Sequence, residues 1–139
     1  MISDPNCIFC KIVAGTIPSF RIYEDGRTQA FMDINPANDG HCLVIPKAHY
    51  PTIFAIPAEE FAAASRTAVR IANAVNQVLV PDGINILQAN GPGAAQSVFH
   101  LHIHVLPRRH GDGLLLNWTP KPGDRTRIAE IAEKIKQAL

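Results

Sequence analysis

Five short stretches of the chain have the hydrophobic patterns of β-strands, in which hydrophobic and polar residues alternate or nearly all residues are apolar. These stretches are residues 20–24, 29–34, 41–46, 84–88 and a last one from Ser97 or Val98 to Leu106. Asp25-Gly26 lies between the first two and is typical of a hairpin turn. The third stretch is almost entirely apolar, so we expect it in the centre of a sheet.

A helical repeat covers residues 57–80, where apolar side chains recur every three or four positions. These side chains are Phe61, Ala64, Ala68, Ile71, Val75 and Val78. Pro57 suits the first turn, and Glu59 and Glu60 complement the helix dipole there. The Pro-Asp-Gly sequence that follows Val80 is expected to end the helix.

Two further helices are predicted towards the ends of the chain, a short turn or helix over 8–14 and a helix over 125–138. The latter has Asp124 as a suitable N-cap and an apolar stripe of Ile128, Ile131 and Ile135. The elements together predict the α+β fold class, with an antiparallel sheet of about five strands and the long helix across one face. No repeat or linker interrupts the chain, so we expect one domain over 1–139.

Composition excludes several classes of function. The 139 residues are 47% hydrophobic and 18% charged, which is ordinary for a globular protein, and the net charge of +1 gives no overall field for binding nucleic acid. No stretch approaches the ~20 apolar residues of a membrane helix, and residues 1–6 do not resemble a signal peptide. Three cysteines form no disulfide framework, so we expect a cytoplasmic protein with neither membrane nor nucleic-acid partners.

The candidate chemistry centres on His100, His102 and His104, which alternate with aliphatic residues. On a strand the three imidazoles leave one face, and the outer two lie ~6.6 Å apart along the chain. Because each buried ring nitrogen needs a hydrogen-bond partner, such crowding favours a metal site or a phosphate-handling site over packing alone. The glycine-rich stretch 91–97 could bring backbone N–H groups to an anion, with Gln96 and Ser97 as side-chain donors.

The histidine run resembles the signature of the histidine triad (HIT) superfamily of nucleotide hydrolases and transferases. Further blocks follow in that family's order: CIFCKI at 7–12, GTIPS at 15–19, IYED at 22–25, FMDI at 31–34, GHCLVIPKAH at 40–49 and QSVFH at 96–100. The resemblance implies a single HIT-like domain with a motif-bearing core of about 7–107 and a tail and helix over 108–139. The opening blocks favour the nucleotide-binding branch, although VLPR at 105–108 also occurs in dinucleoside polyphosphate hydrolases.

The resemblance implies that His102 attacks the α-phosphorus of a purine nucleotide and forms a nucleotidyl-histidine intermediate, which water hydrolyses. His104 would donate to the phosphate oxygens, His41 would support the nucleophile, and His100 completes the catalytic set. The nucleotide would contact ten residues, with Asp33 on the ribose hydroxyls and apolar residues around the base: Ile8, Phe9, Phe31, Asp33, Ile34, Asn90, Gln96, Ser97, His102 and His104.

Two departures from the family pattern bear on the position of the leaving group. Ala89 stands where the nucleotide-binding branch has Asn, and the neighbouring Gln88 or Asn90 could supply that amide. Ala95 stands where the family commonly has Gly.

Cys7 and Cys10 have the spacing of half a zinc site, which alone is a weak signal because two reduced thiols are the alternative. The resemblance to bacterial-type members implies that His49 and His100 complete a closed structural zinc site. It also implies a homodimer in which C-terminal residues such as Trp118 approach the partner's site.

Four functions remain open on the sequence. The first is a purine nucleoside phosphoramidase acting on AMP-type substrates, and the second is a dinucleoside polyphosphate hydrolase with the same nucleophile. The third is a nucleotide-binding or regulatory protein with little turnover. The fourth is a metallohydrolase in which His100, His102 and His104 bind one zinc ion together.

Overall fold

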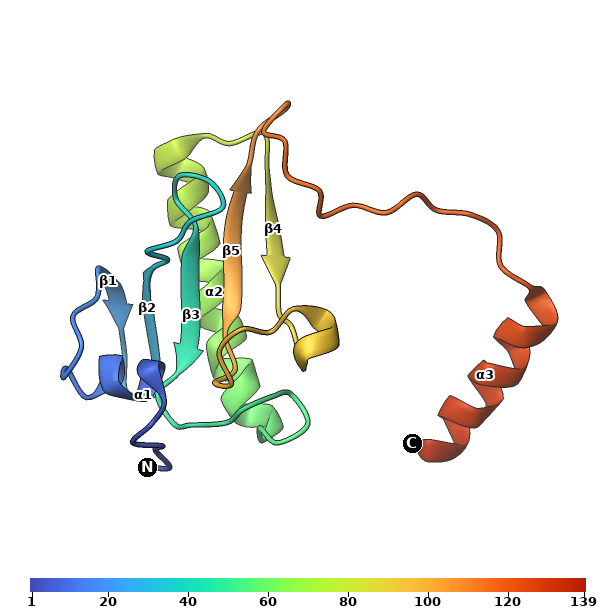
Figure 1. Ribbon diagram of the computed structural model, residues 1–139, viewed down its shortest axis with the longest axis horizontal. Helices are drawn as coiled ribbons and strands as arrows, with labels where there is room; N and C mark the ends of the chain where they lie inside the picture. Colours follow the sequence, from blue (N-terminus) through green and yellow to red (C-terminus); the bar gives the residue numbers. More distant parts are fainter.

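One antiparallel sheet forms the centre of the computed structural model, which describes residues 1–139 (Figure 1). Its strands are β1 (Arg21–Glu24), β2 (Thr28–Met32), β3 (Cys42–Pro46), β4 (Gly83–Leu87) and β5 (Ile103–Arg108), in the spatial order β1-β2-β3-β5-β4. The helices are α1 (Ile8–Val13), α2 (Ala58–Leu79) and α3 (Arg125–Ala138), and one 3₁₀ turn, η1, spans Pro92–Ala94. The predicted α+β class and five-stranded sheet are confirmed.

The apolar strand β3 is the middle strand, as its composition predicts, with β2 on one side and β5 on the other. All five of its residues are buried. The long helix α2 covers one face of the sheet and contacts β2, β3 and β5. Four residues of its predicted stripe are buried there, whereas Val78 is 76% exposed and its neighbour Leu79 packs against the core instead.

The short helix α1 lies over the opposite face of the sheet. Phe9 of this helix packs with Phe31, Leu43 and Ile45 of β2 and β3 in a second, smaller core. The ring centroids of Phe9 and Phe31 are 5.4 Å apart with the rings nearly perpendicular, a favourable aromatic geometry. The second face is therefore only partly covered, and the uncovered part lies beside the histidine run.

The last strand begins later than its sequence pattern predicts. The alternation favours a start at Ser97 or Val98, but β5 starts at Ile103. The amide of Leu101 donates to the carbonyl oxygen of Tyr50, a loop residue, at 2.6 Å. The carbonyl oxygen of His100 accepts a hydrogen bond from the His102 side chain. Because these backbone groups are used outside the sheet, His100 and His102 precede the strand and only His104 lies within it.

The chain beyond β5 leads away from the sheet to α3, which lies apart from the rest of the molecule (Figure 1). The bounds of α3 match the prediction, and the Asp124 side chain accepts hydrogen bonds from the amides of Thr126 and Arg127 as the N-cap. No residue of α3 is buried, so its stripe of isoleucines is exposed. None of the helices combines the length and the hydropathy that crossing a membrane requires.

Candidate functional site

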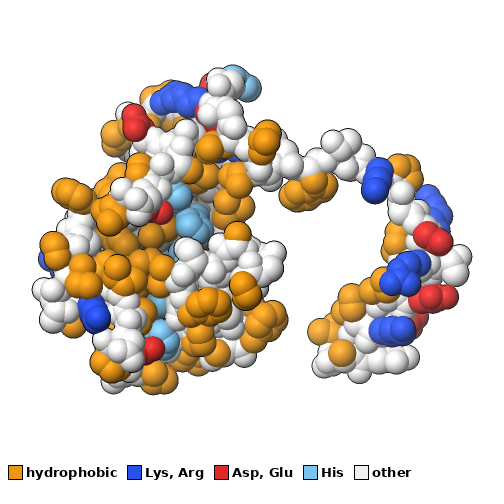
Figure 2. Space-filling model, in the orientation of Figure 1, with side chains coloured by type: hydrophobic (Ala, Val, Ile, Leu, Met, Phe, Trp, Pro, Cys, Tyr) orange, Lys and Arg blue, Asp and Glu red, His pale blue; other side chains and the backbone are white.

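A cavity of about 330 Å³ opens between α1 and the uncovered part of the sheet. Eight of the ten predicted nucleotide contacts line it: Ile8, Phe9, Phe31, Asp33, Ile34, Ser97, His102 and His104. Figure 2 shows histidine side chains among hydrophobic ones on this face of the molecule. The cavity therefore combines apolar walls with a carboxylate and two imidazoles.

The ring of His102 is fixed by a backbone acceptor. Its Nδ1 lies 2.7 Å from the carbonyl oxygen of His100, so Nδ1 carries the proton and donates it. The other nitrogen, Nε2, consequently keeps its lone pair. Burial lowers the pKa of His102 below the ordinary histidine value of 6.5, against the opposing effect of the His100 carbonyl, so the ring favours its neutral form. A neutral imidazole with one free lone pair is the nucleophilic form of histidine.

His41 and His104 form a second hydrogen-bonded unit, in which Nε2 of His41 lies 2.8 Å from Nδ1 of His104. The amide of Ala37 donates to Nδ1 of His41 at 3.1 Å. Because that nitrogen accepts, His41 carries its proton on Nε2 and donates it to Nδ1 of His104. His104 in turn carries its proton on Nε2, where it is available to an acceptor. Burial lowers the pKa of His104 to about 4, with smaller contributions from His102 and His41.

The Asp33 carboxylate lies beside this unit, with its Oδ2 atom 3.7 Å from Nε2 of His41. The three ligand atoms of Asp33, His41 and His104 are close enough to surround a cation. The hydrogen bond from Ala37 argues against one, since it leaves no lone pair on the nitrogen of His41 that faces the other two residues. The arrangement fits a chain of hydrogen bonds better than a metal site.

Cys7, Cys10, His49 and His100, the four predicted zinc ligands, meet at the other end of the site; we call them the thiol cluster. Nδ1 of His49 lies 3.3 Å from Nδ1 of His100, and the sulfur–nitrogen distances are 3.4 to 3.6 Å. Tetrahedral zinc with bonds of ~2.05 Å to nitrogen and ~2.3 Å to sulfur has edges of roughly 3.35 Å between nitrogens and roughly 3.55 Å between nitrogen and sulfur. The donor atoms therefore fit such an ion.

A backbone acceptor outside the thiol cluster holds the imidazole of His100 in the orientation that a metal requires, and a carboxylate lies near that of His49. Nε2 of His100 lies 2.8 Å from the carbonyl oxygen of Pro46, and Nε2 of His49 lies 4.0 Å from the Asp4 carboxylate. Both rings direct Nδ1 towards the sulfur of Cys10, and an outer acceptor such as the Pro46 carbonyl is typical of metal-binding histidines. Burial lowers the pKa of His100 to about 4, which favours the neutral form that a metal binds.

The three triad histidines do not face one common point. His100 directs Nδ1 into the thiol cluster, whereas His102 uses its own Nδ1 to donate to the His100 backbone. The hypothesis of a single zinc ion bound by His100, His102 and His104 is therefore wrong, because the late start of β5 turns His100 away from the cavity.

Two predicted nucleotide contacts lie outside the cavity. Asn90 accepts from the amide of Ile53 and exchanges two hydrogen bonds with Gln88. Gln96 is buried and accepts from the amide of Gly91, while its own amide group donates to the carbonyl oxygens of Pro51 and Val98. Both side chains brace the loops around the site and do not line this cavity, so contact of either with a nucleotide stays a prediction. Ala95, where the family commonly has Gly, adopts a left-handed φ of 62°.

The cavity is also lined by residues that the sequence pattern does not single out: Ile12, Ile17, Pro18, Ser19, Met32, Asn35, Leu43 and Val98. The GTIPS block held a signal for three of them, but that block carries no titratable group. The amide of Ala37 has no signal in the sequence, because any residue other than proline offers the same donor.

Comparison with known proteins gives consistent results. The model of the HIT domain family matches residues 14–111. A curated relative, "Protein hit" of Bacillus subtilis, is 43% identical over 135 residues and covers 93% of each chain. The adenosine 5'-monophosphoramidase HNT1 of Saccharomyces cerevisiae is 38% identical over 137 residues, which are 98% of this chain and 84% of that one.

One solved structure of a similar protein contains zinc. The zinc-bound histidine triad family protein from Mycobacterium smegmatis superposes with a TM-score of 0.75 and 40% sequence identity, covering 96% of this chain and 98% of that one.

Proposed function

This chain belongs to the HIT domain family, and from that premise we propose that it hydrolyses purine nucleoside phosphoramidates at the α-phosphate through a nucleotidyl intermediate on His102. The hydrogen bond from Nδ1 of His102 to the His100 carbonyl is the observation that carries the proposal. It leaves Nε2 unprotonated on a ring that lines the cavity. The named activity of the yeast relative supports a phosphoramidase in particular.

The cavity suggests how the nucleotide binds. Ile8, Phe9, Phe31 and Ile34 offer apolar walls for a purine base. Asp33 uses Oδ1 to accept from the amide of Asn35 at 2.8 Å, which fixes the carboxylate for the ribose hydroxyls. With the base and ribose so placed, the α-phosphate would lie between His102 and His104, whose ring centroids are 4.9 Å apart.

The reaction would proceed in two displacements. Nε2 of His102 forms a bond to the α-phosphorus while the phosphorus–nitrogen bond to the leaving group breaks, and the amine takes up a proton from solvent as it leaves. Nε2–H of His104 donates to a non-bridging oxygen and stabilises the charge that develops there. A water molecule then attacks the same phosphorus and loses a proton to solvent, the bond to His102 breaks, and the nucleoside monophosphate is released with His102 neutral again.

We also propose that the thiol cluster holds a structural zinc ion. Four protein ligands leave no open position for water, so the ion would stabilise the fold and take no part in the reaction. Cys10 lies within α1, and Cys7 caps the helix by accepting from the amide of Cys10, so the metal would fix a wall of the cavity. The expected location stays cytoplasmic, because free cysteines such as Cys7 and Cys10 are typical of a reducing compartment.

A homodimer is the assembly we propose. An apolar groove of about 520 Å³ lies between α2 and β4, where Val69 is 62% exposed and Ile86 is 52% exposed. β4 is also an edge strand with unpaired backbone groups. The tail exposes Trp118 and the α3 stripe, which two copies could bury against each other.

We expect an Ile86→Lys variant to sediment as a monomer and the wild type as a dimer; a monomeric wild type would refute the dimer.

The intermediate provides the test of the proposed function. We would mix the protein with adenosine 5′-phosphoramidate, quench in base within milliseconds, and locate the added mass by tandem mass spectrometry. The expected result is a nucleotidyl group on His102, absent from a His102→Ala variant and present in a His110→Ala variant, whose imidazole is 93% exposed. Binding without an adduct or product over hours would support the regulatory alternative and overturn the enzyme assignment.

A further inference from the structure

We propose that Asn38 and Asp112 are positioning residues that fix the tautomers of His41 and His104 from outside the cavity. They would act by holding the loop over residues 35–40, whose Ala37 amide donates to His41. The catalytic consequence rests on the proposed function, whereas the effect on the tautomers does not.

Asp112 is held in place by several hydrogen bonds and is the residue to which Asn38 binds. Its carboxylate receives two hydrogen bonds from Arg108, at 2.7 Å from Nε and 3.0 Å from Nη2. It also accepts from the amides of Arg109 and Leu114, and its side chain is only 9% exposed. Arg108 in turn donates to the Asn85 side chain. The guanidinium beside it holds the pKa of Asp112 well below its usual range, so the carboxylate stays charged.

Asn38 joins this fixed group to the loop. Its Nδ2 atom donates one proton to Oδ2 of Asp112 at 2.9 Å and the other to the carbonyl oxygen of Pro107 at 3.0 Å. Both amide protons are therefore used. The carbonyl oxygen of Asn38 accepts from the backbone amide of His41 at 3.2 Å, so the same residue also holds the start of β3.

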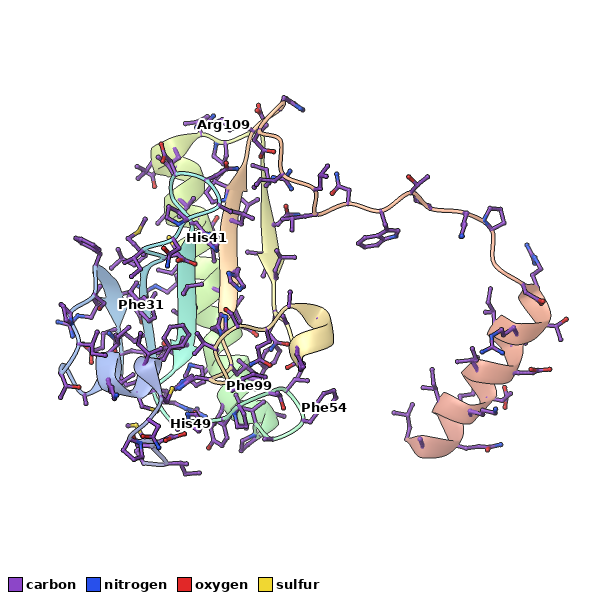
Figure 3. All side chains as sticks on the ribbon, in the orientation of Figure 1. Phe31, His41, His49, Phe54, Phe99 and Arg109 are labelled. Atoms are coloured by element: carbon purple, nitrogen blue, oxygen red, sulfur yellow. The ribbon has the colours of Figure 1, made fainter.

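Gly40 allows the loop to lie this close to the end of β5. It adopts a φ of +87°, and a Cβ atom there would overlap Leu79 and approach Pro107 at 3.1 Å. Figure 3 shows His41 towards the end of the sheet at which Arg109 lies. Two features therefore hold the loop in place. The Asn38 side chain binds Asp112 and the Pro107 carbonyl, and Gly40 lets the backbone approach Leu79 and Pro107 closely.

Ala37 precedes Asn38 and is exposed, and its methyl group can form no hydrogen bond that would hold it in place. Its amide reaches His41 only because the following residue is anchored. If the anchor is lost, Nδ1 of His41 loses its donor and the ring is free to carry its proton there instead. His104 would then face a lone pair instead of a donor, and its own proton would no longer be held on Nε2, the nitrogen that serves the phosphate.

The test combines nitrogen NMR of the imidazoles with steady-state kinetics on an Asn38→Ala variant. In the wild type we expect both His41 and His104 as Nε2–H tautomers at pH 7.5. In the variant we expect mixed tautomers at both rings, with kcat reduced about tenfold and KM within twofold, since general acid–base terms of this kind contribute factors of 10²–10⁴ when removed entirely. An Asn38→Ser variant should show the same mixed tautomers and reduced kcat, because serine suits a loop but is too short to reach Asp112. It serves as the second variant if Asn38→Ala fails to fold.

An Asp39→Ala variant is the matched control, because Asp39 is exposed in the same loop and makes no hydrogen bond. Its tautomers and kcat should equal those of the wild type. Unchanged tautomers in Asn38→Ala would overturn the proposal, even if kcat fell. If the wild type cleaved no phosphoramidate, the proposed function would fail, and the NMR comparison would still decide whether Asn38 sets the tautomers.

Discussion

The thiol cluster and the cavity histidines (His41, His102 and His104) lie at the two ends of one site and use opposite ring nitrogens. His100 donates from Nε2 to the Pro46 carbonyl and keeps Nδ1 for the thiol cluster. Two residues later, His102 donates from Nδ1 to the His100 carbonyl and keeps Nε2 for the cavity. The difference shows that the position of a backbone acceptor determines which imidazole nitrogen keeps its lone pair.

The two ends are also mechanically joined. Phe9 of α1 lies edge-on to both rings, with centroids 5.9 Å from His100 and 5.2 Å from His102. The same helix carries Cys10 and lines the cavity. We therefore expect damage at the thiol cluster to reach the cavity in weakened form, and damage at the cavity histidines to leave the thiol cluster intact.

The largest effect is expected from His102→Ala, which removes the nucleophile. We predict that kcat/KM falls by at least about 10³-fold, since no neighbouring ring offers the same free lone pair. Zinc content, measured by elemental analysis, should stay at the wild-type value because His102 contributes no ligand. Activity within tenfold of wild type would contradict the assignment of the nucleophile.

The opposite change, Cys10→Ser, should remove the metal and spare the chemistry in part. We predict loss of bound zinc, a fall in the melting temperature on the order of 10 °C, and a smaller loss of kcat/KM than in His102→Ala. Cys42→Ala is the matched control, because Cys42 is equally buried but lies in the core beneath α2. Full zinc occupancy in Cys10→Ser, measured in reduced protein, would exclude the proposed ligand set.

The pH dependence of the reaction should separate this site from an ordinary surface histidine. Burial lowers the pKa of His102 below the ordinary value of 6.5 and brings that of His104 to about 4, so both rings lose their neutral form at a lower pH than an exposed histidine does. We predict that the decline of kcat/KM with falling pH is centred below 6.5. The measurement requires zinc content at each pH, and a decline centred at 6.5 or above with zinc still bound would contradict the prediction.

The smallest effect is expected from Ala95→Gly, a change that touches neither end of the site. The left-handed φ of 62° at Ala95 suits glycine, so relief of strain should stabilise the protein by about 0.5–1 kcal/mol. Thermal unfolding should show a melting temperature raised by about 2 °C, with zinc content unchanged. A lower melting temperature would show that the methyl group of Ala95 contributes more packing than its backbone costs.

The sequence predicts the sheet, α2 and α3 well, because a period of two or of 3.6 residues survives in any chain that buries one face. It also identifies the four members of the thiol cluster, but only through the resemblance, since Cys7 and Cys10 alone are half a site. The apolar stripe of α3 is equally visible in the sequence, yet nothing in the pattern tells what covers it.

What the sequence could not predict depends on backbone atoms. The acceptors that orient His100 and His102 are carbonyl oxygens, and the donor to His41 is an amide, so residue identity carries no trace of them. The alternation of the histidine run begins before the true start of β5, at Ile103, for the same reason. Asn38 and Asp112 are 74 positions apart, and short-range patterns do not report such a pairing.

The most direct test of the opposite use of ring nitrogens is one long-range nitrogen–proton NMR spectrum of the zinc-loaded protein, labelled with ¹⁵N at histidine. We predict that His100 shows a protonated Nε2 and a metal-shifted Nδ1, and that His102 shows a protonated Nδ1 and a free Nε2. The same tautomer at both rings, or a metal-shifted nitrogen in His102, would contradict the account.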